Sequence, residues 1–392
     1  MLRYALCLLF LSSQTFAHEG EAYNYFKSIE HQWLGNIARL DFPGSAAESG
    51  SAHKLKLPNG NRLTYGDIIA LGGDYYGVPE SPICDGTNDA DRMSRFLLAF
   101  DTLAQEPKSC DDDYCANKVL AIFREERSAH IESGVSGPVP SRTAANLLSI
   151  EFYTSNNFLK LAINNWDHFL PTSMVAYDAG HGAAIAQAIK ARKMATPKER
   201  LEGLELAFAM NAFVDHYLTD AFSSGHVRIP RRPLYEQLTM ASMAGLLTGQ
   251  MHDEDGRVGL TVRNAEGKIW RMYGDGTLFM PGSEENKKMV ARAVQTSIEE
   301  VFNAFKTGRT QSKDEYGIKK LVPLLDDELM HPKNDSLNSA PLYTLGPDGT
   351  VLARTPENSL CSYDWTADWT GLAQLVGYSS SGDGSDCKFN PR

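Results

Sequence analysis

The sequence has no apolar run long enough to span a membrane. The run over residues 4–11, near its start, is shorter than the ~20 residues that a spanning helix needs. It follows a basic start at Arg3 and precedes small residues that end at Ala17, as in a secretory signal peptide. We therefore predict a signal peptide over 1–17, cleavage after Ala17, and a secreted or periplasmic protein with no transmembrane segment after signal removal.

Positive charge is also scarce. The chain has 392 residues, with 38 Lys and Arg against 49 Asp and Glu, and its net charge is −11. Tight binding to a nucleic-acid backbone needs a basic surface, so we expect no nucleic-acid partner. An acidic balance does not exclude an enzyme, because bound metal ions can supply positive charge where the chemistry needs it.

Cysteines are few, and none has the CxxC spacing of a thiolate zinc site. Removal of the signal would take Cys7 away and leave an odd number in an oxidising compartment: Cys84, Cys110, Cys115, Cys361 and Cys387. We expect Cys361 and Cys387 to staple the C-terminal tail, and two of the other three to pair.

Helical periodicity is the main structural signal. It predicts an all-α fold with helices over 18–40, 65–71, 144–165, 182–194, 201–222 and 285–306. The segment 201–222 is apolar on nearly all sides, which is typical of a helix at the centre of a bundle. Between them, 80–145 reads as an insertion that is polar and loop-rich in parts.

From about residue 310 the composition changes. Gly, Pro, Ser and Asn become frequent, and short strand-like runs occur at 342–345 and 350–352. We predict a helical domain over 18–314, followed by a small β-rich extension over 315–392.

Histidines and carboxylates carry the chemical signal. His216 and Asp220 lie at i and i+4 on one face of the predicted central helix, and His226 follows a possible turn at Gly225. Ionisable groups inside an apolar helix are costly unless they are paired or bind metal. A lone buried His–Asp pair is the alternative explanation, but the third ligand-type residue weakens it.

Further candidate ligands lie elsewhere. His18 would be the mature N-terminus, where its α-amine and carbonyl could chelate a metal. His31 lies on the first predicted helix, His168 ends another, and His252 is followed by the carboxylates of 253–255. Histidine nitrogen and carboxylate oxygen, with room for water, are the donors of catalytic zinc sites.

These motifs resemble the zinc-dependent bacterial phospholipase C family, which shares a helical fold and a trinuclear zinc site with P1-type nucleases. The spacing 31 − 18 = 13 between the N-terminal ligand and His31 is the family's, with Trp33 two residues further. The family motif His-x-x-x-Asp-x-x-x-x-x-His matches His216, Asp220 and His226. The stretches 64–75 and 252–255 are closest to the larger Gram-negative branch.

The resemblance extends to other positions. Asp74-Tyr75 and His168-Phe169 match the family's Asp-Tyr and His-Phe pairs. The chain departs from the family at the last zinc, where His-x-x-x-Glu is replaced by His252 with Asp255, or with Asp253. The stretch between Asp74 and His168 is also much longer than in the shortest members.

The resemblance implies three Zn²⁺ ions per chain, each with its own ligands. One zinc would bind His18, His31 and Asp220. A second would bind Asp74, His168 and His216, with Asp220 as a bridge. A third would bind His226, His252 and Asp255. Asp74 would also be the catalytic group that orients or deprotonates water. Glu21, Tyr75 and Trp166 would form a pocket for a quaternary ammonium headgroup.

Several of these residues have simpler interpretations. Tyr75 and Trp166 could be core aromatics. His181 could touch substrate, although a surface histidine is the simpler interpretation. Arg228, Arg231 and Arg232 could bind phosphate or form a solvated basic turn.

The leading functional interpretation is a monomeric phospholipase C that acts on phospholipid at a membrane surface. It would release diacylglycerol and a phosphorylated headgroup from phosphatidylcholine and other glycerophospholipids. One alternative is a P1-type nuclease or phosphatase with the same metals. Another is a zinc-binding protein that has lost catalysis.

Overall fold

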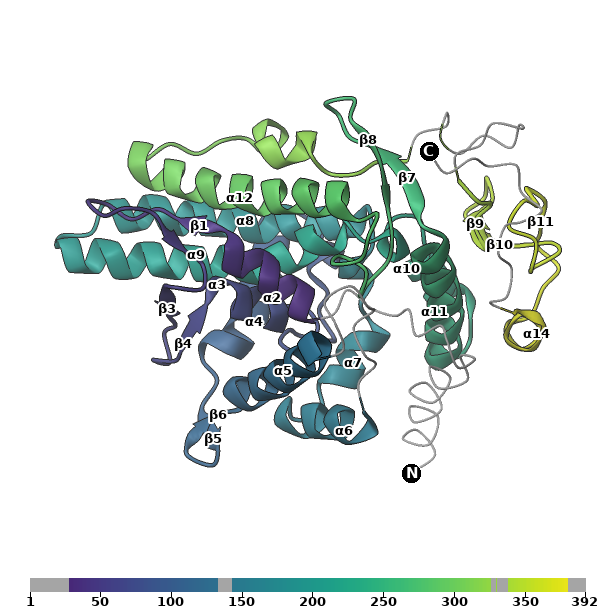
Figure 1. The fold of residues 1–392 in the computed structure, drawn as a ribbon, viewed down its shortest axis with the longest axis horizontal. Helices are drawn as coiled ribbons and strands as arrows, with labels where there is room; N and C mark the ends of the chain where they lie inside the picture. Colours follow the sequence, from purple (N-terminus) through teal and green to yellow (C-terminus); the bar gives the residue numbers. More distant parts are fainter. Residues whose placement is uncertain (1–27, 133–142, 326–328, 330–337, 380–392) are drawn as a thin grey trace. The chain divides into compact units, whose positions relative to one another are not determined.

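The computed structural model describes residues 28–132, 143–325, 329 and 338–379 (Figure 1). Helices dominate this part of the chain, and its strands form antiparallel sheets of two or three strands. The prediction of a mainly helical fold with a small β-rich part is therefore confirmed. None of the described helices is long and apolar enough to cross a membrane. The predicted signal peptide, His18 and Glu21 lie outside the described residues.

The chain divides into two compact units. The first, here called the N-terminal unit, comprises 27–221 and 287–322. The second, the C-terminal unit, contains 222–286 and the described residues from 323 onward. The predicted boundary near 315 lies close to the second crossing between the units. However, 222–286, which we predicted as part of the helical domain, packs with the C-terminal segment instead.

The N-terminal unit is built from helices with three small hairpins. Its helices are α2 Ser28–Ile37, α3 Tyr65–Leu71, α4 Asp89–Ala104, α5 Cys115–Glu132, α6 Ala144–Tyr153, α7 Phe158–Ile163, α8 Thr172–Arg192, α9 Pro197–Asp220 and, from residue 287, α12 Glu284–Thr307. The hairpins pair β1 Arg39–Leu40 with β2 Glu48–Ser49, β3 Lys54–Lys56 with β4 Arg62–Thr64, and β5 Lys108–Cys110 with β6 Asp113–Tyr114.

Helix α9 is the central helix that its all-round apolar sequence predicts. The Thr196 side chain caps its N-terminus, Glu199 completes a capping box, and Pro197 occupies the first turn, where no backbone donor is needed. Almost every residue from Gly203 to Asp220 is buried. Helices α8 and α12 lie beside α9 (Figure 1), and α3 packs against it.

Two other parts of this unit differ from prediction. The single helix expected over 144–165 is two helices, because Ser155 and Asn156 adopt left-handed backbone angles between them. The segment 80–145, expected to be loop-rich in parts, contains the long helices α4 and α5.

The described cysteines follow the expected pairing in part. A disulfide joins Cys110 to Cys115, so two of the three candidate cysteines pair, as expected. Cys361 is also disulfide-bonded, whereas Cys387 lies outside the described residues.

The C-terminal unit mixes helices with two small sheets. Its elements are α10 Arg231–Gln237, α11 Ala241–Val258, β7 Leu260–Arg263, β8 Ile269–Met272, β9 Tyr343–Leu345, β10 Val351–Arg354, β11 Trp365–Thr366 and α14 Gly371–Gly377. Strands β7 and β8 form a hairpin in which Leu260 pairs with Met272, and the other sheet has the order β11-β10-β9. The predicted strand-like runs correspond to β9 and β10.

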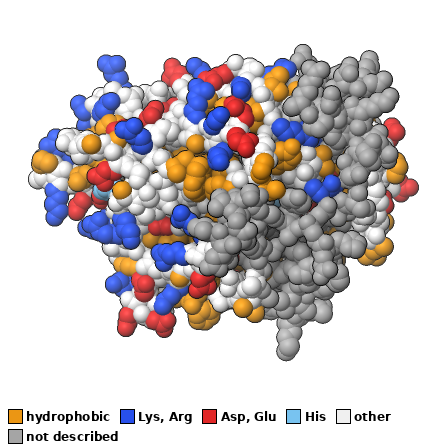
Figure 2. Space-filling model, viewed as in Figure 1, with side chains coloured by type: hydrophobic (Ala, Val, Ile, Leu, Met, Phe, Trp, Pro, Cys, Tyr) orange, Lys and Arg blue, Asp and Glu red, His pale blue; other side chains and the backbone are white. Residues whose placement is uncertain are grey.

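The surface carries charges of both signs. Figure 2 shows basic and acidic side chains interspersed on one face, with apolar side chains between them. Several histidines and carboxylates are instead buried, as described next.

Candidate metal centres

The N-terminal unit brings five of the predicted ligands together. His31, His216 and Asp220 form one group, and Asp74, His168 and His216 form another; within each group the ligand atoms lie within 4.8 Å of one another. Helix α2 supplies His31, and a 3₁₀ turn over Trp166–His168 supplies His168. The segment after α3 supplies Asp74, and α9 supplies the other two residues. Because His216 belongs to both groups, they form one continuous centre.

The Asp220 carboxylate faces three imidazoles. Its Oδ1 lies 3.5 Å from Nε2 of His31. Its Oδ2 lies 2.7 Å from Nδ1 of His168 and 3.5 Å from Nε2 of His216. The side chain is almost inaccessible to solvent. A carboxylate with different histidines at its two oxygens has the geometry of a bridging ligand between two cations.

A backbone carbonyl sets the orientation of His216. Its Nδ1 lies 2.9 Å from the carbonyl oxygen of Ile69, which can only accept a hydrogen bond. In the neutral ring the proton is therefore on Nδ1, and the lone pair of Nε2 faces the centre, where Nδ1 of His168 lies at 3.2 Å and Oδ2 of Asp220 at 3.5 Å. A histidine held in this way by an outer partner is typical of metal ligands.

His31 is oriented by a hydroxyl. Its Nδ1 lies 2.8 Å from Oγ1 of Thr219, and that hydroxyl has the carbonyl oxygens of Asp215 and His216 within 2.8 Å. Since the hydroxyl proton goes to a helix carbonyl, Thr219 accepts from Nδ1 of His31. The proton of the neutral His31 ring is therefore on Nδ1, and the lone pair of Nε2 of His31 faces Asp220.

His168 lies in a strongly negative environment. Burial disfavours its charged form, but the carboxylates of Asp220 and Asp74 outweigh burial and raise its pKa to about 8. The site therefore favours positive charge at this position, either on the ring or as a bound cation.

Asp74 is the most exposed member of the centre. Its side chain is 35% exposed, and its Oδ1 lies 3.9 Å from Nδ1 of His168 and from Nε2 of His216. The preceding residue, Gly73, has a φ of +72°, and a Cβ there would lie 2.6 Å from Cδ2 of His216. Only glycine allows the chain to pass this close to the histidines on its way to Asp74.

The C-terminal unit contains a separate group of His226, His252 and Asp275. Oδ2 of Asp275 lies 3.6 Å from Nε2 of His226 and 3.2 Å from Nε2 of His252. Its other oxygen, Oδ1, is buried and has no hydrogen-bond partner among the described residues. Burial disfavours the Asp275 carboxylate, but the two histidines outweigh it and hold its pKa well below the usual range. An unsatisfied carboxylate oxygen beside two imidazoles fits a cation site.

Asp255, the residue that we predicted as the third ligand here, is engaged elsewhere. It is fully buried, and its two oxygens accept hydrogen bonds from Nε and Nη2 of Arg228, at 2.9 and 2.5 Å. A carboxylate held by both prongs of a guanidinium is already neutralised. The structure thus places Asp275 where the prediction had Asp255.

Asp253, the other candidate, contacts the opposite side of the His252 ring. Its Oδ1 lies 3.1 Å from Nδ1 of His252, whereas Asp275 faces Nε2. Asp253 is therefore positioned to orient the ring, rather than to bind a metal together with Nε2 of His252. Burial lowers the pKa of His252, but the two carboxylates outweigh this effect and raise it to about 10.

Backbone contacts bring the segments of this group together. Ser224 donates from its backbone to the carbonyl of Tyr273 at 3.2 Å, and from its hydroxyl to the carbonyl of Asp255 at 2.8 Å. The backbone of Gly274 donates to the carbonyl of Gly256 at 3.0 Å, where a Cβ on Gly274 would collide with the Gly256 backbone. Because both residues are glycines, the segment after β8 can lie close to α11, which brings Asp275 near His252.

The two aromatic residues predicted at the substrate lie in the core. Tyr75 is 2% exposed; its hydroxyl lies 2.7 Å from Oγ of Ser28, and its ring stacks on Phe158. Trp166 is 7% exposed and donates from Nε1 to Asp85 at 3.3 Å. The core interpretation, which we gave as the alternative, therefore describes both residues.

Two of the interpretations given for the remaining basic residues do not fit the structure. His181 is fully buried within α8 rather than at the surface, with Nδ1 at 2.6 Å from Oδ1 of Asn211. Arg228 and Arg231 are buried as well, so they do not form a solvated turn. Arg232 is the exposed member of the three, and it pairs with Glu236.

Comparison of this chain with protein-family models, curated proteins and solved structures found no match. The geometry of these two centres and the motifs are therefore the observations from which a function can be inferred. Sequence reasoning missed Asp275, Thr219 and the Ile69 carbonyl. Spacing had no signal for them, because each reaches its histidine through the fold rather than along one helix.

Proposed function

We propose that this chain is a zinc-dependent phospholipase C that hydrolyses glycerophospholipids to diacylglycerol and a phosphorylated headgroup. The observation that carries the proposal is the continuous centre in the N-terminal unit, where two groups of ligand atoms share His216 and face the Asp220 carboxylate. The family resemblance of the motifs supplies the reaction class and the substrate.

The donor atoms suit zinc. The centres offer imidazole nitrogens and carboxylate oxygens, with no cysteine in any of the groups found among the described residues. Zinc takes this donor set in catalytic sites, whereas calcium and magnesium prefer oxygen alone. The hydrogen bonds of His31 and His216 favour the tautomer that a metal ligand needs. Oδ1 of Asp275 has no hydrogen-bond partner among the described residues and could bind a cation. We propose three zinc ions, with His18 remaining a predicted ligand.

The residues of the chain then have distinct tasks. Bound zinc would supply Lewis acidity toward the phosphate diester. Asp74, the carboxylate that reaches solvent, would orient a water molecule and accept its proton. Attack of that water on phosphorus breaks the bond from phosphorus to the diacylglycerol oxygen, and the departing oxygen takes up a proton from solvent to give the alcohol. Asp220 and the histidines are buried, which keeps their positions fixed during the reaction.

The experiment is an assay of the purified protein with zinc on three substrates: phosphatidylcholine vesicles, phosphatidylglycerol vesicles and single-stranded DNA. We expect diacylglycerol from the lipids and no cleavage of DNA. His216→Ala should lower turnover by at least about 10³-fold and remove the metals of the N-terminal unit, since this residue serves both groups.

His53→Ala is the matched control, because His53 pairs with Glu48 and Glu205 outside the centre. It should keep both metal and activity. Cleavage of DNA with inert lipids would replace the proposal with a P1-type nuclease. Bound zinc with no hydrolysis of any substrate would favour a protein that has lost catalysis.

A further inference from the structure

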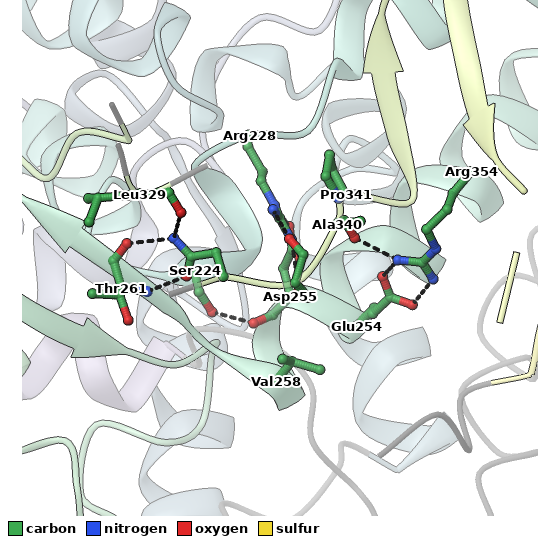
Figure 3. A network of polar contacts seen from close by, with 12 residues as sticks. Ser224, Arg228, Glu254, Asp255, Val258, Thr261, Leu329, Ala340, Pro341 and Arg354 are labelled. Carbon is green, nitrogen blue, oxygen red and sulfur yellow. Dashed lines mark hydrogen bonds and ion pairs between the residues drawn. The ribbon is translucent and has the colours of Figure 1, made fainter. Parts of the chain in front are cut away.

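Helix α11 carries two buried carboxylates directly after its cluster histidine. Glu254 and Asp255 follow His252 by two and three residues, and both are almost completely buried. Figure 3 shows each carboxylate facing an arginine that comes from another segment of the chain. Neither arginine belongs to the group of His226, His252 and Asp275.

Arg354, at the end of β10, binds Glu254. Its Nη1 and Nη2 donate to Oε1 and Oε2 of Glu254 at 2.8 and 2.7 Å, and its side chain is inaccessible to solvent. The same guanidinium donates to the carbonyl of Ala340 at 2.6 Å and, from Nε, to that of Glu357 at 3.1 Å. The hydroxyl of Tyr378 adds a further bond to Glu254 at 3.3 Å.

Arg228 joins three segments. It lies two residues after His226, and it binds both oxygens of Asp255 on α11. It also donates to the carbonyl and the hydroxyl of Ser339, at 2.8 and 3.1 Å. One guanidinium therefore connects the segment of His226, the helix of His252 and the C-terminal segment.

The two arginines meet at one short stretch of chain. Ser339 accepts from Arg228, and its neighbour Ala340 accepts from Arg354. Asn338, just before them, receives the backbone N–H of Thr261 at 2.6 Å and donates to the carbonyl of Thr261 at 2.8 Å. The C-terminal segment is thus fastened to α11 and to β7 by specific bonds, most of which involve buried charge.

Buried ion pairs add little net stability to the packing of two segments, because apolar residues of similar size often stabilise a protein as well or better. What bidentate pairs add is a defined geometry, since the two prongs of a guanidinium fix both distance and orientation. Here they fix α11 at the turn that also carries His252.

We infer that the segment 338–379 is a positioning element of the C-terminal metal group. Its Arg354 pairs with Glu254, and its Ser339 binds Arg228, which pairs with Asp255. Through these contacts, here called the clamp, it holds α11 and the segment of His226 so that both histidines face Asp275. The inference rests on the metal binding included in the proposed function but is independent of the substrate.

The test measures zinc affinity rather than activity. In the full chain carrying His216→Ala, which removes the ligand shared in the N-terminal unit, zinc is titrated against a chromophoric chelator. Arg354→Met should weaken the remaining site by about 10- to 100-fold, the usual effect of losing an outer partner of a metal ligand. Lys268→Met is the control: it breaks an exposed pair with Glu285 in the same unit and should change nothing.

A second variant covers the case in which Arg354→Met does not fold. Ser339→Ala removes the hydroxyl that accepts from Arg228 but leaves every charge in place, so we expect a folded protein with a smaller loss of affinity. Hydrogen exchange of the α11 amides should be faster in both clamp variants, with or without zinc.

Three results would overturn the inference: zinc affinities in the clamp variants equal to that of Lys268→Met, unchanged exchange in α11, or no zinc uptake by the parent. If the parent binds zinc and the clamp variants lose it as expected, while the wild-type protein hydrolyses no phosphodiester, the proposed function fails and the clamp stands.

Discussion

The histidines of the two units are held by different kinds of partner. In the N-terminal unit, a hydroxyl orients His31 and a backbone carbonyl orients His216, and both partners are neutral. In the C-terminal unit, His252 has a carboxylate at each ring nitrogen, Asp253 on one side and Asp275 on the other. A carboxylate partner makes an imidazole a stronger metal ligand, but it also makes its proton harder to displace.

The supports also differ. The N-terminal centre takes His216 and Asp220 from one long helix buried along most of its length. The C-terminal group takes Asp275 from a segment after a hairpin, and its geometry depends on the clamp and on the contact between Gly256 and Gly274. The N-terminal centre therefore combines a buried helix and two neutral orienting groups with carboxylates around His168, whereas the C-terminal group depends on ion pairs and on one close contact between glycines.

The first way to break this comparison is to remove the shared carboxylate of the C-terminal group. Asp275→Asn should cost more than the about 10- to 100-fold in zinc affinity that losing an outer partner costs, because it removes a ligand. Asp253→Asn, which removes only the orienting partner of His252, should stay within that range. Zinc affinity measured in the His216→Ala protein reports both effects, and equal losses would show that Asp275 is not a ligand.

The second prediction concerns Gly73, which lies against the histidines of the N-terminal centre. Gly73→Ala should displace His216 and His168, weaken zinc binding in that unit, and lower the free energy of unfolding by about 1–3 kcal/mol. Gly60→Ala is the control, since Gly60 has a similar positive φ of +91° but its Cβ would meet only the Tyr114 hydroxyl at 3.5 Å. It should share the backbone strain and leave zinc binding intact. Calorimetry with metal analysis separates the two effects.

The last prediction concerns the metal-free protein. The pKa of His168 is raised to about 8, so its protonation stabilises the fold fully below about pH 6.5 and is lost as the pH rises through about 8. That loss amounts to about 2 kcal/mol, the shift of roughly 1.5 pH units converted at 1.36 kcal/mol each. For His252 the same sign applies, but the window extends to about pH 10.

Urea unfolding of the chelator-treated protein across this pH range tests the assignment. The difference between wild type and His168→Gln should shrink from pH 6.5 to 8 and then stay constant, whereas the difference for His252→Gln should continue to shrink above pH 8. Identical profiles for the two variants would contradict the different charge environments of the two units.

Local patterns predicted the helices whose ends and faces are determined by nearby residues. Helix α3 spans the predicted residues; Thr64 and Asp67 form a capping box at its start, and Gly72 caps its end. The prediction failed over 144–165, where periodicity continues across Ser155 and Asn156 although their backbone turns left-handed. Local patterns also had no signal for the packing of 222–286, whose partners come from the far end of the sequence.

For the candidate sites, the sequence by itself determined the pairing of His216 with Asp220. Helical geometry puts residues four apart on one face, and an apolar helix leaves them buried; their 3.5 Å approach follows from both. Only the tertiary structure decided between Asp255 and Asp275. Both are buried carboxylates near His252, and the difference between them is which one lies beside a guanidinium in the fold. Arg228 takes Asp255, and Asp275 is left facing the histidines with one oxygen unsatisfied. Such competition between side chains brought together from distant segments has no counterpart in local sequence spacing.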